Sequence, residues 1–338
     1  MPQMQLADIF TKPEFTVGVN EAQIEKNAFI QSGVQIPDKE LMTFSRSTSD
    51  AGEATSIVPL SYVEPTYGSD DPDDKLIPQK MGTVQHGFRK AVRTQGWSAM
   101  NLAQALAHVD PYAGVKQTVG NYWALDNQRR LIQTFIGLYA LNKAGEGDMI
   151  KDVATDTTGA ITDAERASAR NFLDALALKG DMDNVLAVGM HSTVYYGLRK
   201  MRHITDRTDP VTNSKFAEFE GKRVIVDDAI PAVAGTNRIK FTSILFGAGA
   251  VRAGEGNNSK IKDVETVRDA LAGGGTGQDT YITRRTDILV PAGFSYKGKK
   301  GSGQTGLFPK LAELADPANW EQIWDSKNIP VSFLVTNG

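Results

Sequence analysis

The chain has 338 residues, of which 41% are hydrophobic, so it is long enough for two domains or for one core with large excursions. Its 37 basic and 40 acidic residues give a formal net charge of -3, which argues against a dedicated nucleic-acid binder with a large basic excess. The sequence has no cysteine, which excludes disulfides, thiolate metal sites and cysteine nucleophiles.

The distribution of apolar residues gives no sign of secretion or of a membrane span. The first residues hold no apolar run of signal-peptide type. The most apolar helical stretch, residues 131–141, is too short to cross a bilayer. We therefore expect a soluble chain in the cytosol.

The N-terminal region, residues 1–36, predicts an arm with little structure of its own. Residues 19–33 have a helical period, but the stretch is short and Gly33 ends it. Because so short a helix buries little surface, we expect the arm to lie on another part of the protein or on a partner.

A long hairpin-like excursion follows. Residues 55–65 and 82–95 are predicted to be extended, and the stretch between them is turn-rich and acidic. Val84, Phe88 and Val92 fall on one face of the second strand, and Arg89 and Arg93 on the other. An isolated hairpin is marginally stable in water, so this one requires a partner surface. The acidic residues of the intervening stretch are Asp70, Asp71, Asp73 and Asp74.

The clearest helix in the sequence runs from Asp110 to Gly145. Asp110 can cap it, Pro111 suits its first turn, and apolar residues recur at helical spacing until Lys143. At 1.5 Å per residue the helix is about 50 Å long. The predicted helix contains three glycines, Gly114, Gly120 and Gly137. Each glycine disfavours a helix by about 1 kcal/mol relative to alanine, so we expect a bend or a close backbone contact at these positions.

A mixed region completes the chain. Thr162 and Glu165 have capping-box spacing and predict a second helix that ends at Lys179 and Gly180. Short apolar runs then predict strands, separated by one further helix and loops, and a short helix and strand end the sequence. The fold class is therefore α+β. The predicted strands are 184–190, 222–228, 241–247 and one near Val331, Phe333 and Val335, and the intervening helix is 191–202.

Two glycine-rich stretches are similar to nucleotide-binding loops. Residues 293–300, GFSYKGKK, match the phosphate-binding loop except that Lys300 stands in place of the hydroxyl residue that binds magnesium. No helical pattern follows, so we interpret the match as chance. Residues 247–254 have Arg252 where a dinucleotide loop needs its third glycine.

Other polar residues also have structural explanations. Asp227 and Asp228 are neighbours on a strand and point to opposite faces, so we expect them to cap a turn rather than share a proton. His191 is expected to pack or to start a helix. The histidines show no metal-ligand spacing, and no set of residues supports an enzyme, a cofactor or a metal site. The four histidines of the sequence are His86, His108, His191 and His203.

Several phrases in order along the chain resemble the major capsid proteins of tailed double-stranded DNA bacteriophages, which have the Hong Kong 97-type fold. Among them are FIQSGV, RTQGWSAMNLAQALAHVDP, NYWALDNQRRLIQTFIGLYALN, FEGKRVIVDDAIP, ILVPAGFSY and LAELADPANWEQIWDSKNIPVSFLVTNG, which together extend from residue 29 to the end. The resemblance implies an N-terminal arm (1–36), an E-loop with flanking strands (37–96), a peripheral domain (97–180) with a spine helix (about 110–144), an axial domain (181–276) and strands that return to both domains (277–338).

The resemblance also implies a function. The chain would assemble with itself, as hexamers and pentamers, into an icosahedral head shell around the packaged double-stranded DNA, which it would contact without sequence specificity. A separate scaffolding protein, a portal and a decoration protein are the other expected partners. Assembly would take place in the bacterial cytoplasm, and the protein would end in the virion. No covalent crosslink between subunits is expected.

Two alternatives remain at this point. An encapsulin-like compartment shell would share the fold and enclose a cargo enzyme. A nucleotide-using enzyme would depend on residues 293–300 alone. If the shell interpretation holds, the candidate contacts between subunits are the charged residues of the hairpin, namely Asp70, Asp71, Asp73, Asp74, Arg89 and Arg93.

Overall fold

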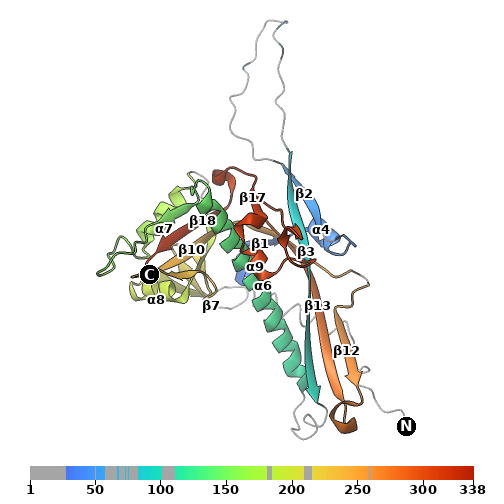
Figure 1. Cartoon of the computed structure of the whole chain (residues 1–338). Helices are drawn as coiled ribbons and strands as arrows, with labels where there is room; N and C mark the ends of the chain where they lie inside the picture. The colour runs from blue at the N-terminus through green and yellow to red at the C-terminus, as the bar shows by residue number, and fades with distance from the viewer. Residues whose placement is uncertain are drawn as a thin grey trace.

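The structure is a computed structural model that describes residues 28–49, 51–57, 67, 73, 75, 83–100, 111–180, 185–208, 215–258 and 260–338. Figure 1 shows two sheets with the long helix α6 between them. One half of α6 lies along the strands β3 and β13, and the other half faces the second sheet. Within the described residues, no helix combines the length and apolarity needed to cross a membrane.

The first sheet is built around β13, which is 14 residues long. Along one edge β13 pairs with β3, from Gln278 to Ile288. Along its other edge it pairs first with β12 and then with β11, so two short strands share the edge of one long strand. The sheet comprises β1 (Gln35–Pro37), β11 (Val251–Glu255), β13 (Gln278–Pro291), β3 (Thr83–Met100) and β2 (Ala51–Ile57), with β12 (Val264–Asp269) also on β13.

The second sheet has its apolar side chains on both faces. Ile244 and Phe333 belong to a core shared with α6, whereas their chain neighbours Leu245 and Leu334 belong to a core under α7 (Ala169–Ala177) and α8 (Ser192–Lys200). Successive strand residues point to opposite faces, so each central strand separates the two cores. The order is β4 (Ile150–Asp152), β18 (Val331–Thr336), β10 (Ile239–Gly247), β5 (Val185–Met190), β8 (Lys222–Val226), β7 (Lys215–Phe219) and β6 (Ile204–Thr208), with β9 (Ala232–Ala234) also on β10.

The predicted long helix is confirmed as α6, Pro111–Ala144. Its fully buried residues include Leu131, Phe135 and Leu138, which lie on the face toward the second sheet. The close contact expected at a glycine occurs at Gly137, where a Cβ atom would stand 2.3 Å from the carbonyl oxygen of Leu314. A side chain at this position would therefore push away α9 (Leu311–Leu314).

The second predicted helix starts later than its sequence signal. Glu165 accepts a hydrogen bond from the Thr162 amide at 2.7 Å, but only a turn forms there. The helix α7 begins at Ala169, and its N-cap is Ser168. The prediction of a start at Thr162 was wrong because the Glu165 carboxylate also binds Thr155 and Arg238, which hold it away from a helical first turn.

Each sheet takes strands from several parts of the chain, and the predicted domain boundaries stay a prediction. Strands β11 and β12 lie within 181–276 but pair in the first sheet, and β4 and α7 lie within 97–180 but pack with the second. Long-range pairing and packing with β13 and β18 bring these elements into their sheets. The remaining elements are α3 (Ala28–Gln31), α4 (Lys39–Ser45), η1 (Ala272–Gly275), β14 (Phe294–Tyr296), β15 (Lys299–Lys300), β16 (Gly303–Gln304), η2 (Pro317–Asn319), β17 (Trp320–Gln322) and η3 (Ser326–Asn328).

The end of the predicted arm is anchored in the subunit. Phe29 is fully buried and meets the ring of Phe246 edge to face at 5.4 Å. The chain then turns at Gly33, whose φ of +75° suits glycine, and enters β1. The rest of the predicted arm, residues 1–27, lies outside the described residues.

Candidate functional site

The hairpin predicted from the sequence is formed by β2 and β3, which pair antiparallel from Ala51 with Arg89 to Ile57 with Thr83. Of the four predicted acidic residues, Asp73 is exposed, and Asp70, Asp71 and Asp74 lie outside the described residues.

Arg89 and Arg93 both have partners within their own chain. Arg89 Nε donates a hydrogen bond to the Gly298 carbonyl at 3.0 Å. Arg93 forms ion pairs with Asp126 of α6 and, at 2.9 Å, with Asp287 of β13. Arg93 lies on the polar face of the predicted strand, and only 18% of its side chain is exposed. A role of these arginines between subunits stays a prediction.

We call Arg93, Asp126, Arg130 and Asp287 the arginine cluster. Arg130 of α6 reaches the second oxygen of Asp287 at 3.4 Å, so one carboxylate serves two guanidinium groups. Burial lowers the pKa of Arg93 to about 10, although Asp287 opposes this effect. The cluster ties three elements together, namely β3, α6 and β13.

An aromatic ring extends the cluster. The guanidinium groups of Arg93 and Arg285 lie over the ring of Trp123, with centroid distances of 5.4 and 5.7 Å. The Trp123 Nε1 atom donates to the Thr283 hydroxyl at 3.1 Å. Arg285 pairs with Glu255 at 3.6 Å, and burial raises the pKa of this carboxyl. Through these two cation–π contacts, Trp123 of α6 meets both β3 and β13.

Beside this cluster lies a cavity of about 580 Å³. Arg93, Trp123 and Glu255 line part of this cavity. Arg46, at the end of α4, lines it as well. Residues of the loop segment 256–263 line this cavity and also a second hollow of about 490 Å³, to which Lys260 and Lys262 contribute. Both hollows therefore lie where β3, β13 and the loop meet.

His86 marks the base of the hairpin and was not singled out by its sequence context. It is 1% exposed, its Nδ1 lies 3.0 Å from the Phe294 carbonyl, and its ring meets Trp324 edge to face at 5.4 Å. Burial lowers its pKa, so the ring is neutral at neutral pH. The only sequence feature that indicated a buried position for His86 was its place two residues before the apolar Phe88.

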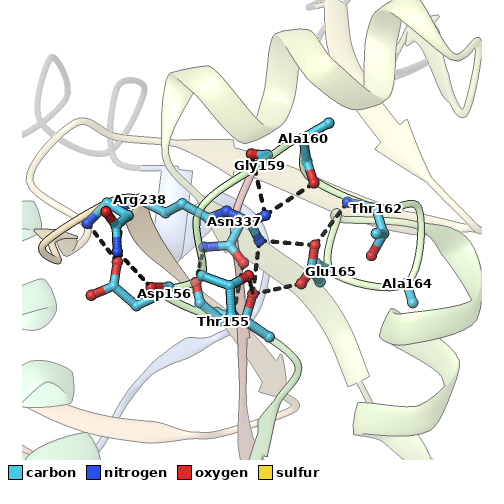
Figure 2. A network of polar contacts seen from close by, with 12 residues as sticks. Thr155, Asp156, Gly159, Ala160, Thr162, Ala164, Glu165, Arg238 and Asn337 are labelled. Atoms are coloured by element: carbon cyan, nitrogen blue, oxygen red, sulfur yellow. Dashed lines mark hydrogen bonds and ion pairs between the residues drawn. The ribbon is translucent and has the colours of Figure 1, made fainter.

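A second polar cluster, the loop clamp, consists of Thr155, Asp156, Glu165, Arg238 and Asn337 (Figure 2). The Asp156 carboxylate accepts hydrogen bonds from the amides of residues 236, 237 and 238 at 2.8 to 2.9 Å, and these bonds, led by that of residue 237, lower its pKa. Arg238 pairs with Glu165 at 3.0 Å, and Asn337 donates to the carbonyl of Thr155. The clamp thus joins three distant segments.

Of the two carboxylates predicted to cap a turn, Asp227 does so, whereas Asp228 binds the start of a distant helix. Asp227 accepts from the Ala229 amide at 2.7 Å and also contacts Gln128. Asp228 accepts from the Ser192 amide at 3.2 Å, at the start of α8. His191 is the N-cap of that helix and accepts from the Thr193 amide, as expected for a histidine that starts a helix.

The stretch that is similar to a phosphate-binding loop has the wrong frame. After β14 the chain forms β15, a turn at Gly301 with φ of +82°, and β16. A phosphate loop needs a helix N-terminus at this point, and residues 299–304 supply two short strands instead. Across the described part of the chain, no group of three or more His, Asp or Glu side chains is placed to hold a metal ion.

Comparison with known proteins gave one sequence relative and several similar structures. No family model matches the chain. The major capsid protein of Bacillus phage SPP1 is 31% identical over 337 residues, which are 98% of this chain and 97% of that protein. The capsid of Ralstonia phage GP4 has a TM-score of 0.59 at 10% identity, over 93% of this chain and 90% of that one. The capsid of cyanophage Pam1 has a TM-score of 0.56 at 10% identity, over 93% of both chains.

Proposed function

Because the chain belongs to the major capsid proteins of tailed bacteriophages, which form the shell of the phage head, we propose a division of that task among its parts. The family is structural, not enzymatic, and the protein is a component of the virion. We propose that β2 and β3 form the E-loop, that α6 is the spine helix of the peripheral domain, and that the second sheet with α7 and α8 is the axial domain. Residues 1–36 are the proposed N-terminal arm.

The hairpin is the part we assign to contacts between subunits. The strands β2 and β3 pair with each other from residue 51 to 57, and β3 joins β13 only from Lys90 onward. The arginine cluster fixes this second half of β3 to α6, so the first half is held at a defined angle. A fixed base suits a repeated contact, since each copy must present the same geometry.

The proposed partners follow from the family. Copies of the chain associate as hexamers and pentamers in an icosahedral shell, a separate scaffolding protein guides them, and a portal and a decoration protein complete the head. The packaged DNA would be contacted without specificity, in keeping with a net charge of -3 that offers no large basic excess. The identity with a phage protein over nearly the whole chain favours this role over an encapsulin-like compartment.

The observation that carries the assignment is the anchored hairpin, and replacing its distal part tests it. We expect a variant in which residues 58–82 are replaced by a short Gly-Ser turn to keep native-like circular dichroism, because the arginine cluster and both cores lie elsewhere. Co-expressed with the scaffolding protein of the same phage, it should give no closed particles in electron micrographs. Closed particles at the wild-type yield would contradict the role of the hairpin.

The charged residues of the hairpin give a finer test. Arg89→Glu loses one hydrogen bond to Gly298, so the subunit should stay folded, whereas closed particles should form more slowly at low salt if Arg89 also meets a neighbour. The matched control is Arg268→Glu, an exposed arginine on β12. Equal assembly rates for both variants and the wild type would remove Arg89 from the proposed contact.

A further inference from the structure

The cavity of about 580 Å³ lies at a gap along one edge of β13. Strand β11 pairs with residues 287–291 of β13, and β12 pairs with residues 278–283, so residues 284–286 have no described strand beside them on that edge. Loop 256–263 crosses the gap. The Arg284 amide donates to the Asp263 carbonyl at 2.8 Å, and the Gly256 amide donates to the Thr286 carbonyl at 3.1 Å. The cavity that remains has the size of a small-molecule site.

One cation at this cavity has no counter-charge. Arg46 is exposed, and its guanidinium forms no ion pair with any of the residues that the structure describes. The backbone makes room for it, because Gly256 has a φ of +152° and a Cβ atom there would stand 2.8 Å from the Arg46 Nε atom. A side chain at residue 256 would displace the guanidinium, so the glycine keeps this cation beside the cavity.

The cavity is also lined by a buried donor and a buried acceptor that lack partners. Arg93 pairs with Asp287 through its Nη2 atom, but its Nε atom is buried with no acceptor in the described ranges. Asn257 donates to Asp263 at 2.6 Å and to the Arg284 carbonyl at 2.8 Å, whereas its buried Oδ1 atom receives no hydrogen bond from a described residue. Buried polar groups without partners cost free energy, so both groups favour a further partner in the cavity.

The carboxyl group of Glu255 supplies a second acceptor. Its ion pair with Arg285 is long, at 3.6 Å, and burial raises its pKa. A further donor would therefore stabilise the charged carboxylate. The cavity thus presents donors, on Arg46 and Arg93, beside acceptors, on Asn257 and Glu255. An anion without a hydroxyl group can satisfy only the donors, whereas an anion that keeps a hydroxyl group can satisfy both kinds of group.

We propose that this cavity binds inorganic hydrogen phosphate. The phosphate oxygens accept charge-assisted hydrogen bonds from Arg46 and Arg93. The hydroxyl group that phosphate retains at neutral pH donates to Asn257 or Glu255. Sulfate has nearly the same size and shape but no hydroxyl group at this pH, so it leaves these acceptors unpaired and binds less tightly. The site does not depend on the proposed role of the hairpin.

Calorimetric titration of the purified full-length chain tests the proposal. The probes are inorganic phosphate and sulfate, each added at neutral pH and at matched ionic strength. We expect phosphate to bind about tenfold more tightly than sulfate, because only phosphate satisfies the acceptors of the cavity. Equal affinity for the two anions, or no binding of phosphate, would overturn the proposal and leave the capsid function untouched.

The variant Arg46→Ala locates the binding site. It should weaken phosphate binding about tenfold, because it removes one charge-assisted donor. Its unfolding temperature without phosphate should match that of the wild type, since this arginine is exposed. The matched control is Arg268→Ala, an exposed arginine on β12 that does not line the cavity, and it should bind phosphate normally. Equal affinities for the two variants would place the anion elsewhere and overturn the proposed site.

The variant Glu255→Gln tests the origin of the selectivity. The amide keeps the shape of the carboxyl group but adds a donor, so sulfate should bind more tightly and the preference for phosphate should fall severalfold. A purely structural role of Glu255 would instead lower both affinities together and leave their ratio unchanged. That result would overturn the recognition of hydrogen phosphate through this carboxylate.

Discussion

The arginine cluster and the loop clamp both join segments that are far apart in the sequence, but they neutralise charge differently. In the arginine cluster, Asp287 is 3% exposed and faces Arg93 and Arg130, so charge is balanced by opposite charge inside the protein. In the loop clamp, Asp156 is bound by the backbone amides of a turn, and this carboxylate remains accessible to water. The difference decides how each responds to mutation and to pH.

Burial makes the first arrangement sensitive to the loss of one partner. Removing one member of a buried ion pair leaves the other charge without solvent and without a counter-charge. The resulting loss in the free energy of unfolding is larger than the net contribution of the pair itself. Backbone amides carry only partial charges, and water can replace an exposed carboxylate that bound them. We therefore expect the two regions to differ in the size of mutational effects and in the sign of their pH dependence.

The largest effect should come from Asp287→Ala. It leaves Arg93 and Arg130 buried without their shared carboxylate, and we expect a loss of about 3–5 kcal/mol in the free energy of unfolding. Urea denaturation followed by tryptophan fluorescence measures it. The matched control is Asp206→Ala, which breaks the half-exposed pair with Arg199 and should cost about 0–1 kcal/mol. Equal losses for the two variants would mean that burial does not distinguish these pairs.

Asp156→Ala should have a smaller effect. It removes the acceptor for three amides in the loop clamp, so the melting temperature should fall, but by less than for Asp287→Ala, because water reaches the exposed amides. Asp156→Asn keeps one oxygen acceptor and should lie between alanine and the wild type. Differential scanning calorimetry gives the order, and a larger fall for Asp156→Ala than for Asp287→Ala would reverse the comparison.

The pH dependence should have opposite signs at Glu165 of the loop clamp and at Glu255, which pairs with Arg285 beside the arginine cluster. Hydrogen bonds from Thr155 and Thr162 lower the pKa of Glu165 from 4.5 to about 2, so its contribution to stability is present above pH 4.5 and is lost as the pH falls toward 2. Burial raises the pKa of Glu255, so the folded state binds the extra proton and stability declines as the pH rises above 4.5.

The variants Glu165→Gln and Glu255→Gln isolate these two carboxyls. The stability difference between the wild type and Glu165→Gln should shrink between pH 4.5 and 2. Glu255→Gln should become more stable relative to the wild type as the pH rises from 4.5. Parallel slopes for the two variants would show that both carboxyls have pKa shifts of the same direction.

The smallest effect is expected outside both regions, at Lys299→Ala. This lysine is exposed on β15, and the chain around it lacks the helix that a phosphate loop requires. Folding, measured by thermal unfolding, and particle formation, measured by electron microscopy, should both be unchanged. Loss of assembly together with loss of nucleotide binding would restore the nucleotide interpretation of residues 293–300.

Local patterns predicted the elements that depend on local sequence. The spacing of apolar residues between Asp110 and Gly145 predicted α6, and the apolar runs near residues 185, 222 and 241 predicted β5, β8 and β10. The capping signal at Thr162 failed because its glutamate has a stronger set of partners in the loop clamp. Capping boxes are local rules, and here a tertiary contact overrides one.

The arginine cluster could not be predicted from the alternation of β3. Arg93 stands on the polar face of the predicted strand, and its partners Asp126 and Asp287 come from a helix and a strand far along the chain. Alternation gives the face on which a side chain lies but not what covers that face. Similarly, no local pattern indicated that β13 would bring loop 256–263 beside Val92 and Thr94.

The position of β18 has a consequence for how the protein is made. This strand pairs with β10 on one edge and β4 on the other, and its alternate residues close the core under α6 and the core under α7 and α8. Neither core can therefore close on the ribosome until residues 331–336 have left the exit tunnel. Synthesis itself thus delays the moment at which a subunit can complete its two cores.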